Sequence, residues 1–259
     1  MAAPSPGGAP KTIFAPSQRK RQDDERFNLS PQQYLERYHI QTYLADAVLM
    51  VMDSRDERPL EATLKYFNSV LQGSHVVLRE FEYVNATPRN RMSFVRIFVE
   101  DNRGVVAESE ITVDDHLQLV MLLCNDFPPS IHQEAASLMA ANGESGFLFG
   151  RVSAYFQVLF VFAEFMAAVR RVLTGTSAEG GRMDRSNFLW AVRNIINTKH
   201  WQFSCPAASL LDSIIAAGLD SGGEKKDTIG IAQFAAGMAQ CESIVLSPKP
   251  DAAVGGGKA

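Results

Sequence analysis

Excess charge, cysteine and long apolar runs are all scarce in this sequence of 259 residues, and each scarcity excludes a class of protein. The formal net charge is only −4, from 25 Lys and Arg against 29 Asp and Glu, which argues against a broadly basic nucleic-acid-binding domain. Three cysteines, odd in number and far apart, exclude a disulfide-dense miniprotein and are typical of a reducing compartment: Cys124, Cys205 and Cys241. No apolar segment follows the first methionine, so we expect no secretory signal.

Motifs for catalysis, cofactors and metals are missing as well. The sequence contains no glycine-rich phosphate loop, and its five histidines show neither His-Glu-x-x-His nor a Cys-x-x-Cys partner. The sequence offers candidate general acid and base groups at Asp114, Asp115 and His116. Two carboxylates at a helix start are more simply complements of the helix dipole. We predict no catalytic residue, no cofactor and no metal ligand. An enzyme with an unrecognised site stays as an alternative, which a deep polar pocket would support.

The longest apolar stretch covers residues 152–169 and is too short for a membrane span of roughly 20 predominantly apolar residues. Gln157 and Glu164 interrupt it, and arginines stand at both of its ends. It therefore predicts one buried central helix and no membrane span.

The two ends of the chain differ in composition from the rest of the sequence, which as a whole is 46% hydrophobic. Residues 1–29 are predicted to be a disordered tail, and the first 22 carry +4 with no acidic residue, which leaves −4 − 4 = −8 for the rest. The cations of this tail are Lys11, Arg19, Lys20 and Arg21. They form either a solubilising tail or a contact to an acidic polymer such as a tubulin tail. Residues 246–259 are predicted to be a second tail, and 175–182 a glycine-rich linker.

Between the tails the sequence predicts an all-α protein that begins with a helical hairpin over residues 30–73. Ser30 and Pro31 are typical of a helix start, and the next apolar stripe runs with helical spacing from Ile40 to Met52. Pro59 begins a second helix with Leu60, Leu64, Phe67 and Leu71 on one face, and Gly73 ends it. Such a hairpin is too small to hide its own apolar face, so it packs either on a partner or on the body.

Beyond the hairpin the sequence repeats a pattern in which a short apolar triplet separates two helices. This pattern predicts EF-hand-like helical domains over residues 74–174 and 183–245. When Leu148 is placed at the centre of a 12-residue calcium loop, the ligand positions are occupied by Ala141, Gly143, Ser145 and Val152. A calcium site needs several oxygen ligands, usually with a closing glutamate. A second loop, from Asp220 to Gln233, has the wrong spacing and a closing glutamine. We therefore predict a degenerate, metal-free array.

One block of sequence, from Tyr66 to His75, resembles the centriolar satellite-associated tubulin polyglutamylase complex regulator family. The resemblance continues through residues 79–81 and 86–94, extends thinly over roughly residues 34–240, and is dense over about 40–95. It implies a non-catalytic scaffold or regulatory protein of centrioles, basal bodies or cilia, associated with the complex that adds glutamate chains to tubulin. The implied partners are subunits of that complex, tubulin, or both. The alternative is a structural axonemal protein bound directly to microtubules through the basic tail.

The hairpin also resembles, more loosely, the RIIa-like docking domain of cAMP-dependent kinase regulatory subunits, through residues 43–48 and 59–67. That resemblance implies a four-helix dimer whose groove takes an amphipathic partner helix. We therefore predict a surface for a partner helix or a second copy of the chain, formed by Ile40, Leu44, Val48, Val51, Leu64 and Phe67. A hairpin packed on its own body remains the alternative.

Overall fold

The computed structural model describes residues 25–144, 146–175, 181–199, 203–220 and 228–247. The chain divides into two compact units, residues 1–46 and 47–259, which are taken separately below. As predicted, helices make up most of the described residues. The α-helices are α1 (Pro31–Arg37), α2 (Ile40–Ser54), α3 (Pro59–Gln72), α4 (Phe81–Asn85), α5 (Pro88–Asp101), α6 (Val113–Met121), α7 (Ser130–Ala141), α8 (Phe149–Val161), α9 (Ala163–Gly175), α10 (Arg185–Lys199), α11 (Leu211–Asp220) and α12 (Ile231–Gln240).

The described part of the first unit holds a single 3₁₀ turn, η2 (Glu25–Asn28), then α1 and the start of α2. The predicted start of α1 is confirmed in atomic detail. The Ser30 hydroxyl accepts a hydrogen bond from the Gln33 N–H at 3.2 Å, and the Gln33 side chain accepts one from the Ser30 N–H at 2.9 Å. This reciprocal pair satisfies two helix-end donors that would otherwise lack a partner.

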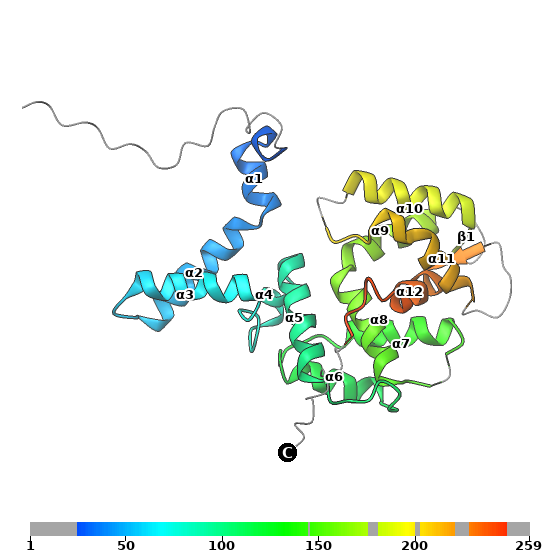
Figure 1. The fold of residues 1–259 in the computed structure, drawn as a ribbon, viewed down its shortest axis with the longest axis horizontal. Coiled ribbons are helices and arrows are strands. Elements are labelled where there is room, and N and C mark those ends of the chain that lie inside the picture. Colours follow the sequence, from blue (N-terminus) through cyan, green and yellow to red (C-terminus); the bar gives the residue numbers. More distant parts are fainter. Residues whose placement is uncertain (1–24, 145, 176–180, 200–202, 221–227, 248–259) are drawn as a thin grey trace, which may run out of the picture. The chain divides into compact units, whose positions relative to one another are not determined.

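The second unit is built around α8, which contacts α5, α6, α7, α9 and α12 (Figure 1). Every residue from Val152 to Val161 is buried, which confirms that this apolar stretch lies in the core. Its rings belong to an aromatic cluster in which Phe127 packs against Phe94, Phe156 and Phe160 with centroid distances of 5.2–5.8 Å. Aromatic pairs at such distances stabilise a core beyond the area that they bury.

The prediction of one helix over residues 152–169 is wrong, because the stretch is divided between α8 and α9, which meet at a bend of 85°. No proline or glycine marks the bend. The nearly buried Arg91 of α5 lies beside it, donating to the Phe160 carbonyl at 3.4 Å and to the Glu164 carboxylate at 2.6 Å. A buried guanidinium thus satisfies a carbonyl at the point where the α8 hydrogen-bond ladder ends. Among the described residues no single helix is long and apolar enough to cross a membrane, and only this bent pair reaches that length and composition together.

Short antiparallel pairings join the loops between helices, a feature that an all-α prediction does not contain. Strand β1 (Arg182–Asp184) pairs with β2 (Thr228–Gly230), with Met183 opposite Ile229. A single bridge joins Glu110 to Leu148 in the same way. A further 3₁₀ turn, η3 (Ala208–Leu210), precedes α11. Most of the predicted linker, residues 176–180, lies outside the described residues.

Candidate partner-binding surface on the helical hairpin

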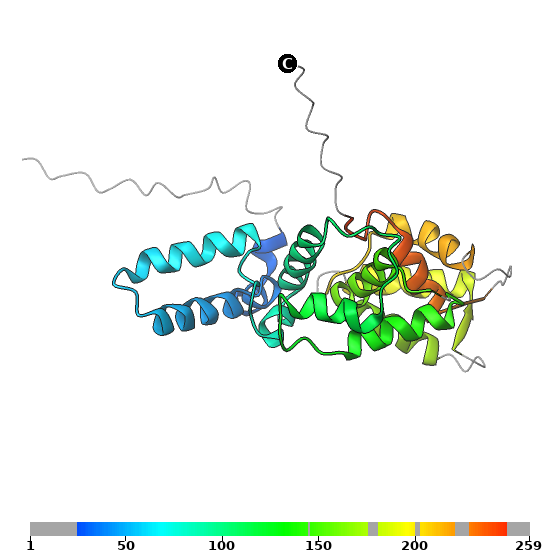
Figure 2. The same cartoon turned by 90° about the horizontal axis from the view of Figure 1, so that it is seen from below.

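The second half of α2 and the whole of α3 run antiparallel (Figure 2), and local chemistry fixes where each helix ends. Arg55 adopts a left-handed conformation with φ of 47°, which stops α2. The Asp56 carboxylate then accepts a hydrogen bond from the Arg58 N–H at 2.8 Å, and Pro59 occupies the first position of α3. Gly73, with φ of 80°, ends α3 as predicted, and its N–H returns to the Ser69 carbonyl at 2.8 Å.

On α3 a buried strip and an exposed apolar stripe lie side by side. Tyr66 and Val70 are buried. The stripe, which we call the α3 seam, consists of Leu60, Leu64, Phe67 and Leu71. Leu60 is 85% exposed, Leu64 62% and Leu71 72%, whereas Phe67 is half-buried. Their spacing of four, three and four residues is that of a helix that packs lengthwise against another helix.

The second half of α2 is apolar around most of its circumference. Ala47 is buried and Val51 half-buried, whereas the larger side chains Val48, Leu49 and Met52 are exposed. A helix that is apolar nearly all round is normally buried. The exposed large apolar side chains are therefore concentrated on α2 and α3, rather than scattered singly as on ordinary surfaces.

The predicted partner-binding residues divide evenly between exposed and half-buried positions. Leu44, Val48 and Leu64 are exposed, whereas Ile40, Val51 and Phe67 are half-buried. The prediction missed the exposed Leu60, Leu71 and Met52, although helical spacing alone had placed Leu60 and Leu71 on the same face as Leu64. The predicted acidic-polymer contacts, Lys11, Arg19, Lys20 and Arg21, lie outside the described residues.

The C-terminal end of α3 is tied to the rest of the second unit by polar contacts. Arg89 of α5 donates to the Val70 carbonyl at 3.1 Å and to the Leu71 carbonyl at 3.2 Å, and Arg96 donates to the Gln72 carbonyl. Cations at a helix C-terminus also complement the helix dipole. The hydroxyls of Tyr66 and Tyr83 share a hydrogen bond at 3.0 Å. The α3 seam is therefore held on a fixed element.

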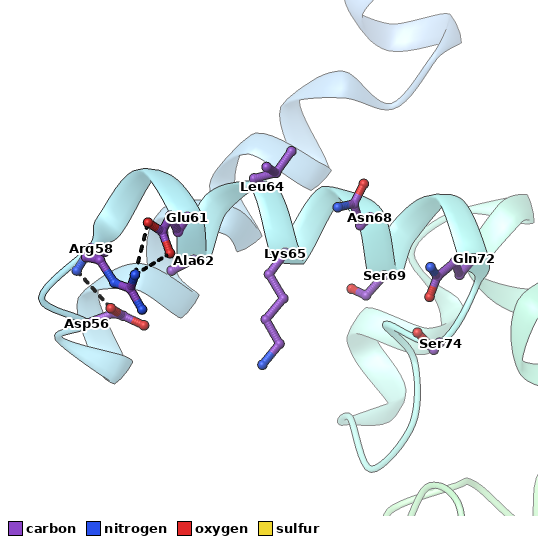
Figure 3. A pocket seen from close by; sticks show the side chains of 10 residues that line it. All are labelled: Asp56, Arg58, Glu61, Ala62, Leu64, Lys65, Asn68, Ser69, Gln72 and Ser74. Atoms are coloured by element: carbon purple, nitrogen blue, oxygen red, sulfur yellow. Dashed lines mark hydrogen bonds and ion pairs between the residues drawn. The ribbon is translucent and has the colours of Figure 1, made fainter.

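A groove of about 780 Å³ runs along α3 and is lined mainly by polar side chains, together with Leu64 of the α3 seam (Figure 3). At one end Arg58 forms an ion pair with Glu61 at 3.0 Å. Lys65 projects from the middle of the helix, and Asn68 and Gln72 follow along its C-terminal half. The groove is open and of mixed charge, and no described group of three His, Cys, Asp or Glu residues in the chain is placed to hold a metal ion.

A buried histidine pair lies in the core between α6, α7 and α8. His116 Nδ1 is 2.9 Å from His132 Nε2, and His116 Nε2 is 2.9 Å from the Ser153 hydroxyl. Burial, assisted by the neighbouring ring, lowers the pKa of His116 to about 3, and burial lowers that of His132 to about 4. Such rings are weak bases, and the Ser153 hydroxyl is buried with them. This geometry is that of a packed polar core rather than of a nucleophile that meets a substrate.

Together these features define a helical protein whose most distinctive surface is an exposed apolar hairpin. The family model described as the CSTPP1 N-terminal domain matches residues 28–73, the hairpin itself. The chain is 30% identical over 231 residues to centriolar satellite-associated tubulin polyglutamylase complex regulator 1 of Mus musculus, covering 74% of this chain and 68% of that relative. The chain therefore belongs to the family of these regulators.

Other relatives carry the same name. The identity to the Homo sapiens protein is 35% over 160 residues, covering 57% of this chain and 47% of that relative. The Danio rerio protein is 31% identical over 159 residues, covering 59% of this chain and 48% of the relative. These two matches span about half the length of the relatives. No solved structure matches the chain.

Proposed function

We propose that the chain is a non-catalytic scaffold or regulatory subunit of a tubulin polyglutamylase complex at centrioles, basal bodies or cilia, and that the hairpin is its docking surface. The exposed α3 seam, within the segment that the family model matches, is the observation that carries the proposal. The complex is inferred from the names of the relatives. Each is called a centriolar satellite-associated tubulin polyglutamylase complex regulator.

The occupant of the surface is an amphipathic helix, supplied by a complex subunit or by a second copy of the chain. Burying one leucine side chain stabilises a contact by roughly 1.5–3 kcal/mol. Two such anchors, Leu60 and Leu64, contribute roughly 3–6 kcal/mol of the about 8 kcal/mol of a micromolar contact, and the other exposed apolar side chains of the hairpin supply the remainder and offset the association costs.

In this proposal residues 74–174 and 183–245 form a degenerate EF-hand-like array that holds the hairpin. Helix–loop–helix units joined in pairs by short antiparallel bridges, at Glu110–Leu148 and at β1–β2, support that assignment. We propose domains at residues 30–73 for the hairpin, 74–174 and 183–245 for the array, and tails at 1–29 and 246–259.

Charge placed in the hairpin surface tests the proposal. Leu64→Asp and Leu44→Asp put an unpaired carboxylate into the contact, so each should abolish capture of complex subunits in affinity purification from ciliated cells. Far-UV circular dichroism should stay unchanged because both side chains are exposed. Lys65→Asp, on the polar side of the same helix, is the matched control and should keep capture. Global unfolding by Leu64→Asp would instead place the seam inside the fold and refute the docking assignment.

A structural axonemal protein bound directly to microtubules is the second candidate, favoured by the +4 charge of residues 1–22. Cosedimentation with microtubules distinguishes the two. Direct lattice binding predicts a steep loss of cosedimentation with salt and with deletion of residues 1–29, because exposed charges are screened within about 10 Å at 0.1 M salt. Binding that survives deletion, and is lost with Leu64→Asp, favours the scaffold.

A further inference from the structure

Helix α10 carries an exposed tryptophan that is surrounded by exposed polar side chains. Trp190 is 73% exposed, although tryptophan is highly buried on average. The positions around it on the same helical face are Ser186, Asn187, Arg193 and Asn194, all of them exposed. Tryptophan and arginine surrounded by serine and asparagine is the composition of surfaces that bind other proteins, with the tryptophan as the dominant anchor.

The same region is the most basic part of the folded body. Residues 165–199 contain six Arg and Lys against two acidic residues, a net +4, which leaves −4 − 4 = −8 for the rest of the chain. Helix α10 itself contains no acidic residue. It contacts α9, its neighbour in Figure 1, which adds the exposed Arg170 and Arg171.

The charges of this region are only partly neutralised. Arg193 pairs with Asp212 of α11 at 2.8 Å, and Arg170 pairs with Glu134 of α7. Both pairs are exposed, so each contributes little to stability. The arginine of each pair can therefore exchange its carboxylate for that of a ligand at little cost. Arg171 and Arg185 have no ion-pair partner among the described residues. Asp184 is occupied at the start of α10, where its carboxylate accepts hydrogen bonds from the N–H groups of Ser186 and Asn187.

We propose that the Trp190 face of α10 binds an acidic, glutamate-rich peptide segment of a partner protein, with Trp190 covering an apolar side chain of that segment and Arg193 meeting its carboxylates. Charge complementarity selects the occupant. A single-stranded RNA is disfavoured, because the face offers one aromatic ring rather than a stacking platform. The inference rests on α9 and α10 alone, independently of the hairpin.

The fluorescence of Trp190 itself reports binding in the full chain. The sequence has two tryptophans, so Trp201→Phe leaves Trp190 as the only one. The probe is a synthetic peptide of glutamates with a single leucine, and its counterpart has glutamine in place of every glutamate. The glutamate peptide should shift the Trp190 emission to the blue and protect it from acrylamide, with a micromolar Kd that weakens as salt rises. The glutamine peptide should leave the emission unchanged.

Two variants test the named side chains, with anisotropy of a labelled peptide as the readout. Trp190→Ala should weaken binding of the glutamate peptide about tenfold or more, as for an interface anchor. Arg193→Glu should weaken it severalfold, mostly at low salt. Leu122→Ala, also at an exposed apolar position but on another helix end, is the control and should bind normally. Leu64→Asp should also bind normally, so a failure here and a failure of the hairpin are distinguishable.

Three outcomes would overturn the inference: no binding of the glutamate peptide, equal binding of the glutamine peptide, or unchanged binding by Trp190→Ala and Arg193→Glu. Competition by polyuridine or by phosphatidylserine vesicles at comparable concentration would also overturn it, because the face would then be a general anion surface. Circular dichroism and the Tm of each variant establish that folding is retained.

Discussion

Phe160 lies where three elements of the core meet. Its side chain is 1% exposed, and its ring packs against those of Phe94, Phe127 and Phe156 at centroid distances of 5.2–5.9 Å. Phe160→Ala should lower the free energy of unfolding by about 3–5 kcal/mol, because the cavity adds to the lost burial. Urea unfolding measures the change. Leu122→Ala, at a site 71% exposed, should change it by less than about 0.5 kcal/mol. An unchanged Tm for Phe160→Ala would mean that the core lies elsewhere.

The buried histidines make stability depend on pH. The folded state holds the pKa of His116 near 3 and that of His132 near 4, whereas both rings titrate near 6.5 when unfolded. Between those values the unfolded chain binds more protons, so the free energy of unfolding should be highest above pH 6.5 and fall as the pH drops toward 4. The slope approaches about 1.4 kcal/mol per pH unit for each histidine.

Denaturant unfolding at pH 7 and pH 5 measures this slope. His132→Asn should flatten it, because one of the two shifted groups is removed. An unchanged slope in that variant would show that other groups dominate the acid response.

At the scale of elements, glycines allow the backbones of α11 and α12 to approach closely. A Cβ atom on Gly237 of α12 would overlap the Ile214 carbonyl of α11, and one on Gly218 would overlap the Gln233 carbonyl. Gly237→Ala should therefore destabilise the protein by about 1–3 kcal/mol, although alanine is the better helix former. Thermal unfolding measures the loss.

Gly175→Ala, at the end of α9, is the matched control, because nothing lies within 4 Å of its added Cβ. It should leave the Tm unchanged or raise it. Equal effects of the two substitutions would contradict a backbone contact between α11 and α12.

Element boundaries were predictable wherever a residue with a strong local preference marks them. Ser30, Pro59, Gly73 and Thr87 begin or end helices as their backbone and capping chemistry requires. The bend after α8 has no such mark, because it depends on the Arg91 guanidinium, which is distant in sequence. Half of the predicted hairpin surface proved half-buried for a related reason: helical periodicity places residues on a face but does not say which flank of that face is covered.

For the whole molecule we expect no calcium response. The loop centred on Leu148 lacks carboxylates at its ligand positions, and Leu148 itself is engaged in the bridge to Glu110. Calorimetric titration of the EDTA-treated protein should show no binding tighter than about 1 mM, the weak end of EF-hand affinities, and Tm should not change. Measurable tight binding would refute the metal-free assignment.

The sequence by itself determined the helical class, the hairpin and the family, because capping residues, apolar periodicity and the block from Tyr66 to His75 are local features. Only the tertiary structure decided which apolar side chains are covered, how α8 turns into α9, and that His116 is buried beside His132 rather than presented with Asp114 and Asp115. Exposure depends on what the rest of the chain brings to a side chain. Leu60 shows this most clearly, since helical periodicity puts it on one face with the half-buried Phe67, yet its side chain is 85% exposed.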